Sequence, residues 1–163
     1  MGGRNRVARA IAAAVVLGTA TSLLAEPVRL ETAADVRSAL IAGREVRVVL
    51  IYKSMSLVNE KGQPETSPDA IGGMPLDVFE YFAPGAVGNP EGYLAASHTQ
   101  VIRHPRHGYV LNYVKLSLYD NGRVKIVAQY LSPTTYEVKM DETFTSQIAT
   151  RDGAGAAHFF AAP

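Results

Sequence analysis

The sequence predicts an α+β fold: one N-terminal helix packed on a strongly curved antiparallel sheet of six or seven strands, either open or barrel-like and nearly closed. One stretch near the start of the chain has helical periodicity and helix-end signals on both sides. From Val46 onward, β-branched and aromatic residues are punctuated by Gly, Pro and Asn, which is typical of a series of strands. No helical stretch separates the later strands, and this favours antiparallel pairing.

Residues 1–25 have the layout of a secretory signal peptide. Three arginines form a positive start, and the apolar segment AIAAAVVLG (10–18) is shorter than the roughly 20 residues that span a bilayer. Cleavage after Ala25 fits best, and cleavage after Ala20 is the alternative. We therefore expect an exported protein, periplasmic or secreted, with a single domain over 26–163 and no stable membrane anchor after signal removal.

The charge balance changes when the signal is removed. The whole chain has 16 Lys and Arg against 15 Asp and Glu, and three arginines lie in the signal, so 13 basic and 15 acidic residues remain, a net charge of −2. A slightly negative domain gives no electrostatic reason to expect a nucleic-acid partner or an anionic membrane. The chain contains no cysteine, which excludes thiol chemistry and a lipoprotein anchor and leaves the hydrophobic core alone to hold the domain.

The helix is expected over Leu30–Arg44, LETAADVRSALIAGR. Thr32 and Asp35 have nearly the spacing and chemistry of a capping box, and Gly43 is placed to end the helix in a left-handed conformation. A helix this short is marginal alone and needs a sheet to lie on. The apolar stripe that would face the sheet consists of Val36, Ala39 and Leu40.

The strands are expected at 45–53, 74–83, 92–103, 109–119, 123–131, 136–145 and 156–161. A polar surface loop, NEKGQPETSPD (59–69), separates the first two. The pair Gly72 and Gly73 precedes a strand rather than a helix, and this fits a β-bulge better than a phosphate cradle.

The turn LYDNGRV (118–124) allows two registers. A two-residue Asn-Gly turn would mix apolar and charged partners on one face. A three-residue turn with Gly122 left-handed gives a clean core face and places Asn112 inward, opposite Tyr130. The second register therefore predicts three apolar pairs: Leu118 with Val124, Leu116 with Ile126, and Val114 with Ala128.

Three blocks of sequence resemble the VirK family of exported bacterial proteins: PDAIGGMPLDVFEYF (68–82), HPRHGYVLNYVKLSLYDNGRVKI (104–126) and YLSPTTYEVKMDETF (130–144), after a related start at 36–49. The order and spacing of the blocks are specific, and the resemblance covers essentially the whole exported domain. It implies a virulence- or host-associated protein through the family's name. It brings no established activity, cofactor or catalytic residue.

The basic stretch VIRHPRHGYV (101–110) surrounds Pro105 with histidine and arginine. Pro105 followed by a glycine is ordinary turn chemistry, so a solvated hairpin tip is the plain interpretation. No third ligand accompanies the histidines, and we expect no metal. The functional alternative is an anion site, because arginine offers paired donors to a carboxylate or phosphate. Its candidate residues are Arg103, His104 and Arg106.

The length of the loop after Arg103 decides which side chains of the expected strand 92–103 point inward. A five-residue loop turns His98 and Gln100 inward beside Asn112, whereas a four-residue loop turns Thr99 and its alternate neighbours inward. Such residues form either a hydrogen-bonded pair in the core or the polar part of a ligand cavity. The candidate ligand-binding residues are therefore His98, Gln100, Asn112, Arg103, His104 and Arg106.

No catalytic motif is present, and neighbouring Asp141 and Glu142 should point to opposite faces of a strand rather than form a dyad. The sequence predicts a non-enzymatic accessory protein that binds a small molecule or a protein partner and uses no cofactor. A small exported hydrolase is the first alternative and would need a Ser or carboxylate within about 3 Å of a histidine. A purely structural or interaction protein is the second, and it predicts an exposed apolar patch or an open sheet edge.

Overall fold

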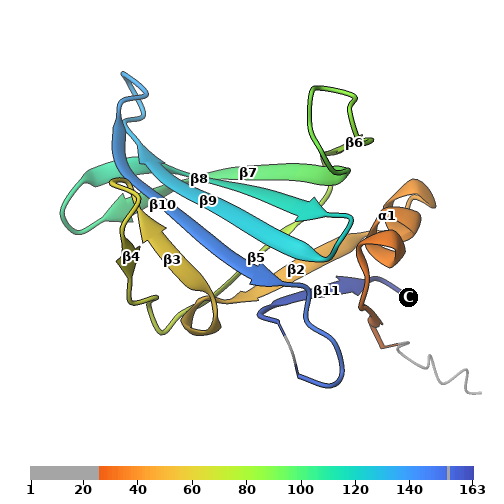
Figure 1. Cartoon of the computed structure of the whole chain (residues 1–163). Coiled ribbons are helices and arrows are strands. Elements are labelled where there is room, and N and C mark those ends of the chain that lie inside the picture. The colour runs from red at the N-terminus through yellow and green to blue at the C-terminus, as the bar shows by residue number, and fades with distance from the viewer. Residues whose placement is uncertain (1–25, 154) are drawn as a thin grey trace, which may run out of the picture.

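The computed structural model describes residues 26–153 and 155–163, so the predicted signal peptide lies outside the described residues. These residues form two antiparallel β-sheets and one short α-helix (Figure 1). The expected α+β class, with a single sheet of six or seven strands, is therefore corrected to a mainly β fold with a four-stranded and a seven-stranded sheet. Within the described ranges the sheets do not close, which also corrects the barrel-like alternative.

The four-stranded sheet has the order β1–β11–β2–β5, and the seven-stranded sheet has the order β4–β3–β10–β9–β8–β7–β6. The first contains β1 (Val28–Leu30), β2 (Val46–Ile51), β5 (Ile71–Pro75) and β11 (Ala157–Ala161). The second contains β3 (Ser56–Asn59), β4 (Pro64–Glu65), β6 (Phe79–Phe82), β7 (Tyr93–His104), β8 (Gly108–Tyr119), β9 (Arg123–Leu131) and β10 (Val138–Gln147). The helices are α1 (Ala33–Ile41) and the 3-10 turn η1 (Tyr52–Ser54), and neither is long and apolar enough to cross a membrane.

Helix α1 begins with the predicted cap. The backbone N–H of Asp35 donates to Thr32 Oγ1 at 3.1 Å, and the backbone N–H of Thr32 donates to Asp35 Oδ2 at 3.2 Å. The helix ends before Gly43, whose φ of +75° is the expected left-handed conformation. Its buried face, which includes the predicted stripe, packs on β1, β2 and β11. The helix is shorter than expected because Leu30 belongs to β1.

The predicted register of the β8–β9 hairpin is confirmed. Leu116 pairs with Ile126, and Gly122 closes the three-residue turn with a φ of +84°. For the β7–β8 hairpin, the observed pairs His98 with Val114 and Gln100 with Asn112 are those of the five-residue loop. Strand pairing continues to His104 and Gly108, so the unpaired tip is shorter than the loop we expected.

The expected strand 74–83 is two strands in different sheets. The chain leaves the four-stranded sheet after β5, turns at the buried Leu76, and enters the seven-stranded sheet as β6. Gly72 and Gly73 lie within β5 and pair with β2 in a continuous register, so the expected β-bulge is wrong. Strands β1, β3 and β4 were not expected; β4 falls within the polar segment 59–69, where its two residues are exposed.

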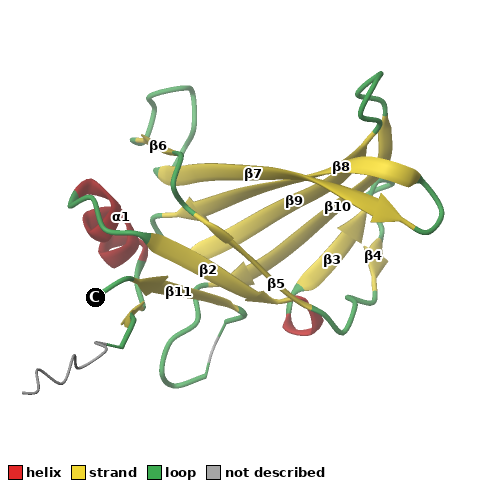
Figure 2. Cartoon of the chain, turned by 180° about the vertical axis from the view of Figure 1, so that it is seen from behind, coloured by secondary structure: helices red, strands yellow, loops and turns green. Residues whose placement is uncertain are grey.

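We define the inner face of the seven-stranded sheet as the one that packs on the four-stranded sheet and α1. Figure 2 shows β2, β5 and β11 crossing in front of one part of this sheet, while the β7–β8 hairpin extends beyond them. In the covered part, the row formed by Leu116, Ile126 and Phe144 is 0%, 0% and 3% exposed. In the part beyond, His98 and Gln100 on the same face are exposed. The inner face is therefore buried at one end and open at the other.

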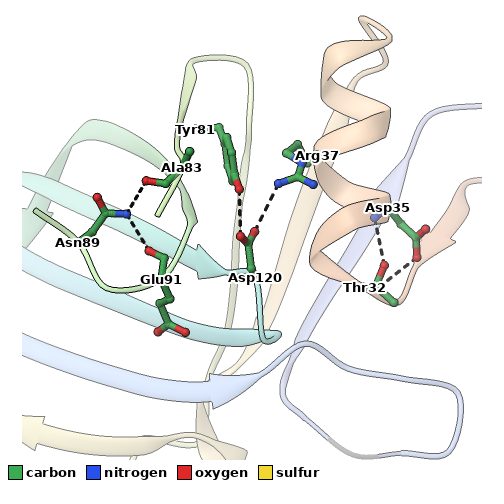
Figure 3. A network of polar contacts seen from close by, with 8 residues as sticks. All are labelled: Thr32, Asp35, Arg37, Tyr81, Ala83, Asn89, Glu91 and Asp120. Atoms are coloured by element: carbon green, nitrogen blue, oxygen red, sulfur yellow. Dashed lines mark hydrogen bonds and ion pairs between the residues drawn. The ribbon is translucent and has the colours of Figure 1, made fainter. Parts of the chain in front are cut away.

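A polar cluster joins α1 to the seven-stranded sheet (Figure 3). The Asp120 carboxylate, in the β8–β9 turn, accepts a hydrogen bond from Tyr81 Oη at 2.9 Å and one from Arg37 Nη1 at 3.4 Å. The Arg37 guanidinium also lies 4.4 Å from the centroid of the Tyr81 ring. Nearby, Asn89 donates to the backbone carbonyls of Ala83 and Glu91 and so shapes the β6–β7 connection. These contacts hold the covered end of the molecule together.

Candidate ligand-binding cleft

A cleft of ≈ 280 Å³ lies between the two sheets, where the inner face emerges from the core. This volume is close to the lower end of the range of about 300–1,000 Å³ that is typical of small-molecule sites. Its floor belongs to the seven-stranded sheet and consists of His98, Gln100, Asn112, Val114, Ala128, Tyr130, Met140, Glu142 and Phe144. The opposite wall includes Leu50, Tyr52, Gly72, Gly73 and Met74.

Two rows of paired residues build most of the floor. One row runs from His98 through Val114 and Ala128 to Glu142, and the next runs from Gln100 through Asn112 to Tyr130. Directly paired residues project from the same face of a sheet. The first row therefore presents polar groups at its ends and small apolar groups in its middle, whereas the second row is polar from Gln100 to Tyr130. The strand pairing itself therefore brings the predicted polar trio into one cleft.

The polar trio is not part of the core. His98 and Gln100 are exposed and Asn112 is half-buried, and no polar side chain in the described part of the chain is fully buried. The alternative of a hydrogen-bonded core pair is therefore not what the fold provides. Instead, these groups face a cleft that solvent can enter.

The wall opposite the floor depends on two glycines. A Cβ on Gly72 would lie 2.7 Å from Tyr52 Cε2, and a Cβ on Gly73 would lie 2.5 Å from the backbone oxygen of Val48. The absence of side chains lets the Tyr52 ring lie against β5 and lets β5 approach β2 closely. The Tyr52 ring also contacts Phe144 edge-to-face, with a centroid distance of 4.8 Å. Tyr52 thus bridges the two sheets at the inner end of the cleft.

Glu142 is a half-buried carboxylate without a counter-charge. Burial, and to a smaller extent the negative charge of Glu65, raise the pKa of the Glu142 carboxyl. None of the ion pairs among the described residues includes Glu142. Burial raises the pKa of the Tyr52 hydroxyl too, with further contributions from Tyr130 and Glu142, which places the three groups within electrostatic range. The cleft is therefore an acidic and aromatic environment.

A second, more polar groove of ≈ 380 Å³ adjoins the cleft and shares Tyr130, Met140 and Glu142 with it. Basic and acidic side chains line this groove together, namely Lys61, His104, Arg106, His107 and Lys139 beside Glu60, Glu65, Asp141 and Glu142. A free anion would meet carboxylates here as well as basic groups, so the hairpin tip does not face a purely basic surface.

The histidines of the tip stack on each other, with 4.8 Å between the ring centroids of His104 and His107. Burial and the neighbouring charges of His107 and Arg106 lower the pKa of His104. Arg103 does not join the cluster, because it is adjacent to His104 in strand β7 and so points to the opposite face. Of the three basic residues predicted together, two share a groove and one does not.

The described residues hold no cluster of three or more His, Asp or Glu that could bind a metal ion. His104 accepts a hydrogen bond from the backbone N–H of Arg106 at 3.2 Å, and no ion pair of the described residues includes a histidine. No hydrogen bond or ion pair of the described residues joins a histidine to a serine or a carboxylate, which is the geometry that the hydrolase alternative requires.

The prediction from sequence missed Glu142 and Tyr52 as cleft residues. Phe144 is a core residue, and the alternation of side chains along a strand places Glu142 on the same face as Phe144. The neighbouring Asp141 points to the opposite face, where it accepts a hydrogen bond from Gln129 Nε2 at 2.9 Å. The position of Tyr52 follows from η1 and from the contact with Gly72, which no local pattern reveals.

Comparison with known proteins adds a family and a fold. The VirK protein family model matches residues 29–136 of the chain. The crystal structure of lpg1832, a VirK family protein from Legionella pneumophila, is similar over 82% of this chain and 98% of that chain, with a TM-score of 0.59 and 20% sequence identity. At this identity the similarity supports the fold alone. No curated protein sequence matches the chain.

Proposed function

This chain belongs to the VirK family, and we propose that it is an exported, non-enzymatic accessory protein that holds a small ligand in the cleft between its two sheets. The observation that carries the proposal is the lining of the cleft: apolar groups such as Val114 and Phe144 lie among a few convergent polar groups such as Asn112 and Tyr52. This mixture is typical of small-molecule sites, where apolar surface supplies affinity and a few polar groups fix orientation.

Export rests on the sequence of residues 1–25, and a part in host interaction rests on the family resemblance. A periplasmic or secreted location is therefore part of the proposal. Expression in a bacterium, followed by mass spectrometry of the protein in the periplasmic fraction and the medium, tests it. An N-terminus at Glu26 or Thr21 outside the cytoplasm supports export, and an uncleaved cytoplasmic chain refutes it.

Ligand binding is tested by a fragment screen read by thermal shift and by backbone NMR. The cleft predicts that hits shift the signals of floor residues, and that Ala128→Phe, which fills the middle of the floor, removes binding. The matched control is Ala95→Phe, on the outer face of the neighbouring part of the sheet, which should bind as the wild type does. Hits that bind equally to Ala128→Phe would contradict the proposal.

A second candidate, a partner-binding protein, is favoured by an apolar row on the outer face of the seven-stranded sheet. Val101, Leu111, Leu131 and Val138 are paired across β7, β8, β9 and β10, and the outer two are 64% and 48% exposed. Exposed apolar surface of this kind marks protein contact sites. This candidate predicts that Val101→Ser changes the association state seen by light scattering and that fragment hits avoid the cleft.

A further inference from the structure

The floor of the cleft carries one full charge in an aromatic setting. Among the described lining residues, Glu142 is the carboxylate, and the titratable His98 stands at the other end of the same row, with Val114 and Ala128 between them. No lysine or arginine of the described residues lines the cleft, whereas Lys61, Arg106 and Lys139 line the adjoining groove. A carboxylate that is partly withdrawn from water and has no cation beside it is costly, and a bound cation would remove that cost.

Two tyrosine rings flank this carboxylate. Tyr130 is a diagonal neighbour of Glu142, because Glu142 pairs with Ala128 and Tyr130 lies two residues further along β9. Tyr52 packs on Phe144, which lies two residues from Glu142 on the same face of β10, and the charge of Glu142 acts on the Tyr52 hydroxyl. Aromatic faces attract organic cations through the electron density of the ring, and a nearby carboxylate strengthens that attraction.

From this arrangement we infer that the cleft selects a small organic ammonium ion, whose positive head lies at Glu142 between the rings of Tyr52 and Tyr130. The inference rests on the proposed function, since it names the class of ligand that the same cleft would hold. The apolar groups Val114, Ala128 and Met140 then contact the methyl or methylene groups that surround the charged nitrogen.

Other ligand classes fit the same residues less well. A metal ion would require several converging ligands, and the described residues provide no such cluster. An anion would meet Glu142 directly, and no lysine or arginine of the described residues lines the cleft to compensate it. A neutral ligand of the same shape would fill the cleft but would leave the charge of Glu142 uncompensated.

The test compares choline chloride with its neutral analogue 3,3-dimethylbutan-1-ol, in which carbon replaces the charged nitrogen. Isothermal titration calorimetry is carried out on the purified protein and on two variants. Glu142→Gln removes the proposed partner while keeping its shape. Glu80→Gln removes the same charge from an exposed position on the edge strand β6 and is the matched control.

The inference predicts that choline binds the wild type and Glu80→Gln equally, that Glu142→Gln weakens its binding by about tenfold or more, and that the neutral analogue binds at least about tenfold more weakly than choline. Equal binding of choline and its analogue, unchanged choline binding by Glu142→Gln, or no choline binding at millimolar concentration would each overturn it.

Failure of the inference and failure of the proposed function can be told apart with Ala128→Phe. If neutral or anionic fragments bind the wild type and are excluded by Ala128→Phe, the cleft is a ligand site and only the ammonium inference is lost. If choline binds Ala128→Phe as tightly as the wild type, both are overturned, because the ligand then lies elsewhere.

Discussion

Replacing Gly72 by alanine adds a methyl group where the Tyr52 ring now lies. The added carbon would stand 2.7 Å from Tyr52 Cε2 and 3.3 Å from the Tyr52 hydroxyl, which is closer than packed atoms approach. The Tyr52 ring also packs on Phe144 at a centroid distance of 4.8 Å, so a shift of the ring would disturb that contact. The ring must therefore shift, and the wall of the cleft changes with it.

The cost can be worked from these contacts. Overpacking of this kind costs about 1–3 kcal/mol, whereas replacing glycine by alanine at an unstrained position stabilises by about 0.4–1 kcal/mol through the unfolded chain. Gly72→Ala should therefore destabilise by about 1–2 kcal/mol. In a Tyr52→Ala background the methyl group meets no ring, and the same change should be neutral or stabilising by up to about 1 kcal/mol.

Urea unfolding of the wild type, the two single variants and the double variant, followed by circular dichroism, measures the coupling. For a slope of about 2 kcal/mol per molar urea, the single change should lower the midpoint by roughly 0.5–1 M. Gly73→Ala is the contrasting control, because its methyl group would meet the Val48 backbone oxygen and so should destabilise in both backgrounds. Additive effects of Gly72→Ala and Tyr52→Ala, within about 0.5 kcal/mol, would refute the reasoning.

Three further predictions concern the core, the cleft carboxylate and the polar cluster. Leu116→Ala, in the buried row, should lower the free energy of unfolding in urea by about 2–5 kcal/mol. Lys115→Ala, on the opposite face, should change it by less than about 0.5 kcal/mol, and similar effects of the two changes would mean that the register is wrong. Burial raises the pKa of Glu142, so the ionised carboxylate lowers the stability of the fold above that pKa. Glu142→Gln should therefore be more stable than the wild type at neutral pH, and this gain should vanish as the pH falls through the ordinary glutamate range. A gain that persists in acid would contradict this cause. The hydrogen bond to Asp120 raises the pKa of the Tyr81 hydroxyl, so Asp120→Asn should lower that pKa in an NMR titration, and an unchanged value would show that the bond is not maintained in solution.

Local signals account for the parts of the fold that could be predicted. The cap of α1 and the left-handed Gly122 are set by residues within a few positions, and the β8–β9 register follows because only one alignment puts every apolar side chain on one face. Across β7 the same reasoning leaves two registers open, and the observed pairs of His98 with Val114 and of Gln100 with Asn112 are those of the five-residue loop.

The division into two sheets could not be predicted in this way. The segment IGGMPLDVFEYF (71–82) has the pattern of one continuous strand. Its division into β5, which pairs with β2, and β6, which pairs with β7, depends on residues far away in the chain. The charged and aromatic half of the cleft was missed for the same reason. Tyr52 reaches Phe144 only because η1 carries the chain from one sheet to the other and because Gly72 leaves room for the ring.

The most direct test of the central claim, that the open end of the inner face binds a small organic ammonium ion, is methyl NMR of the protein during titration with choline chloride. The account predicts saturable shifts of the methyl signals of Val114, Ala128 and Met140, which line the cleft, and unchanged signals from Val101 and Val138 on the outer face. Shifts confined to the outer face, or no saturable shift within the cleft, would contradict it.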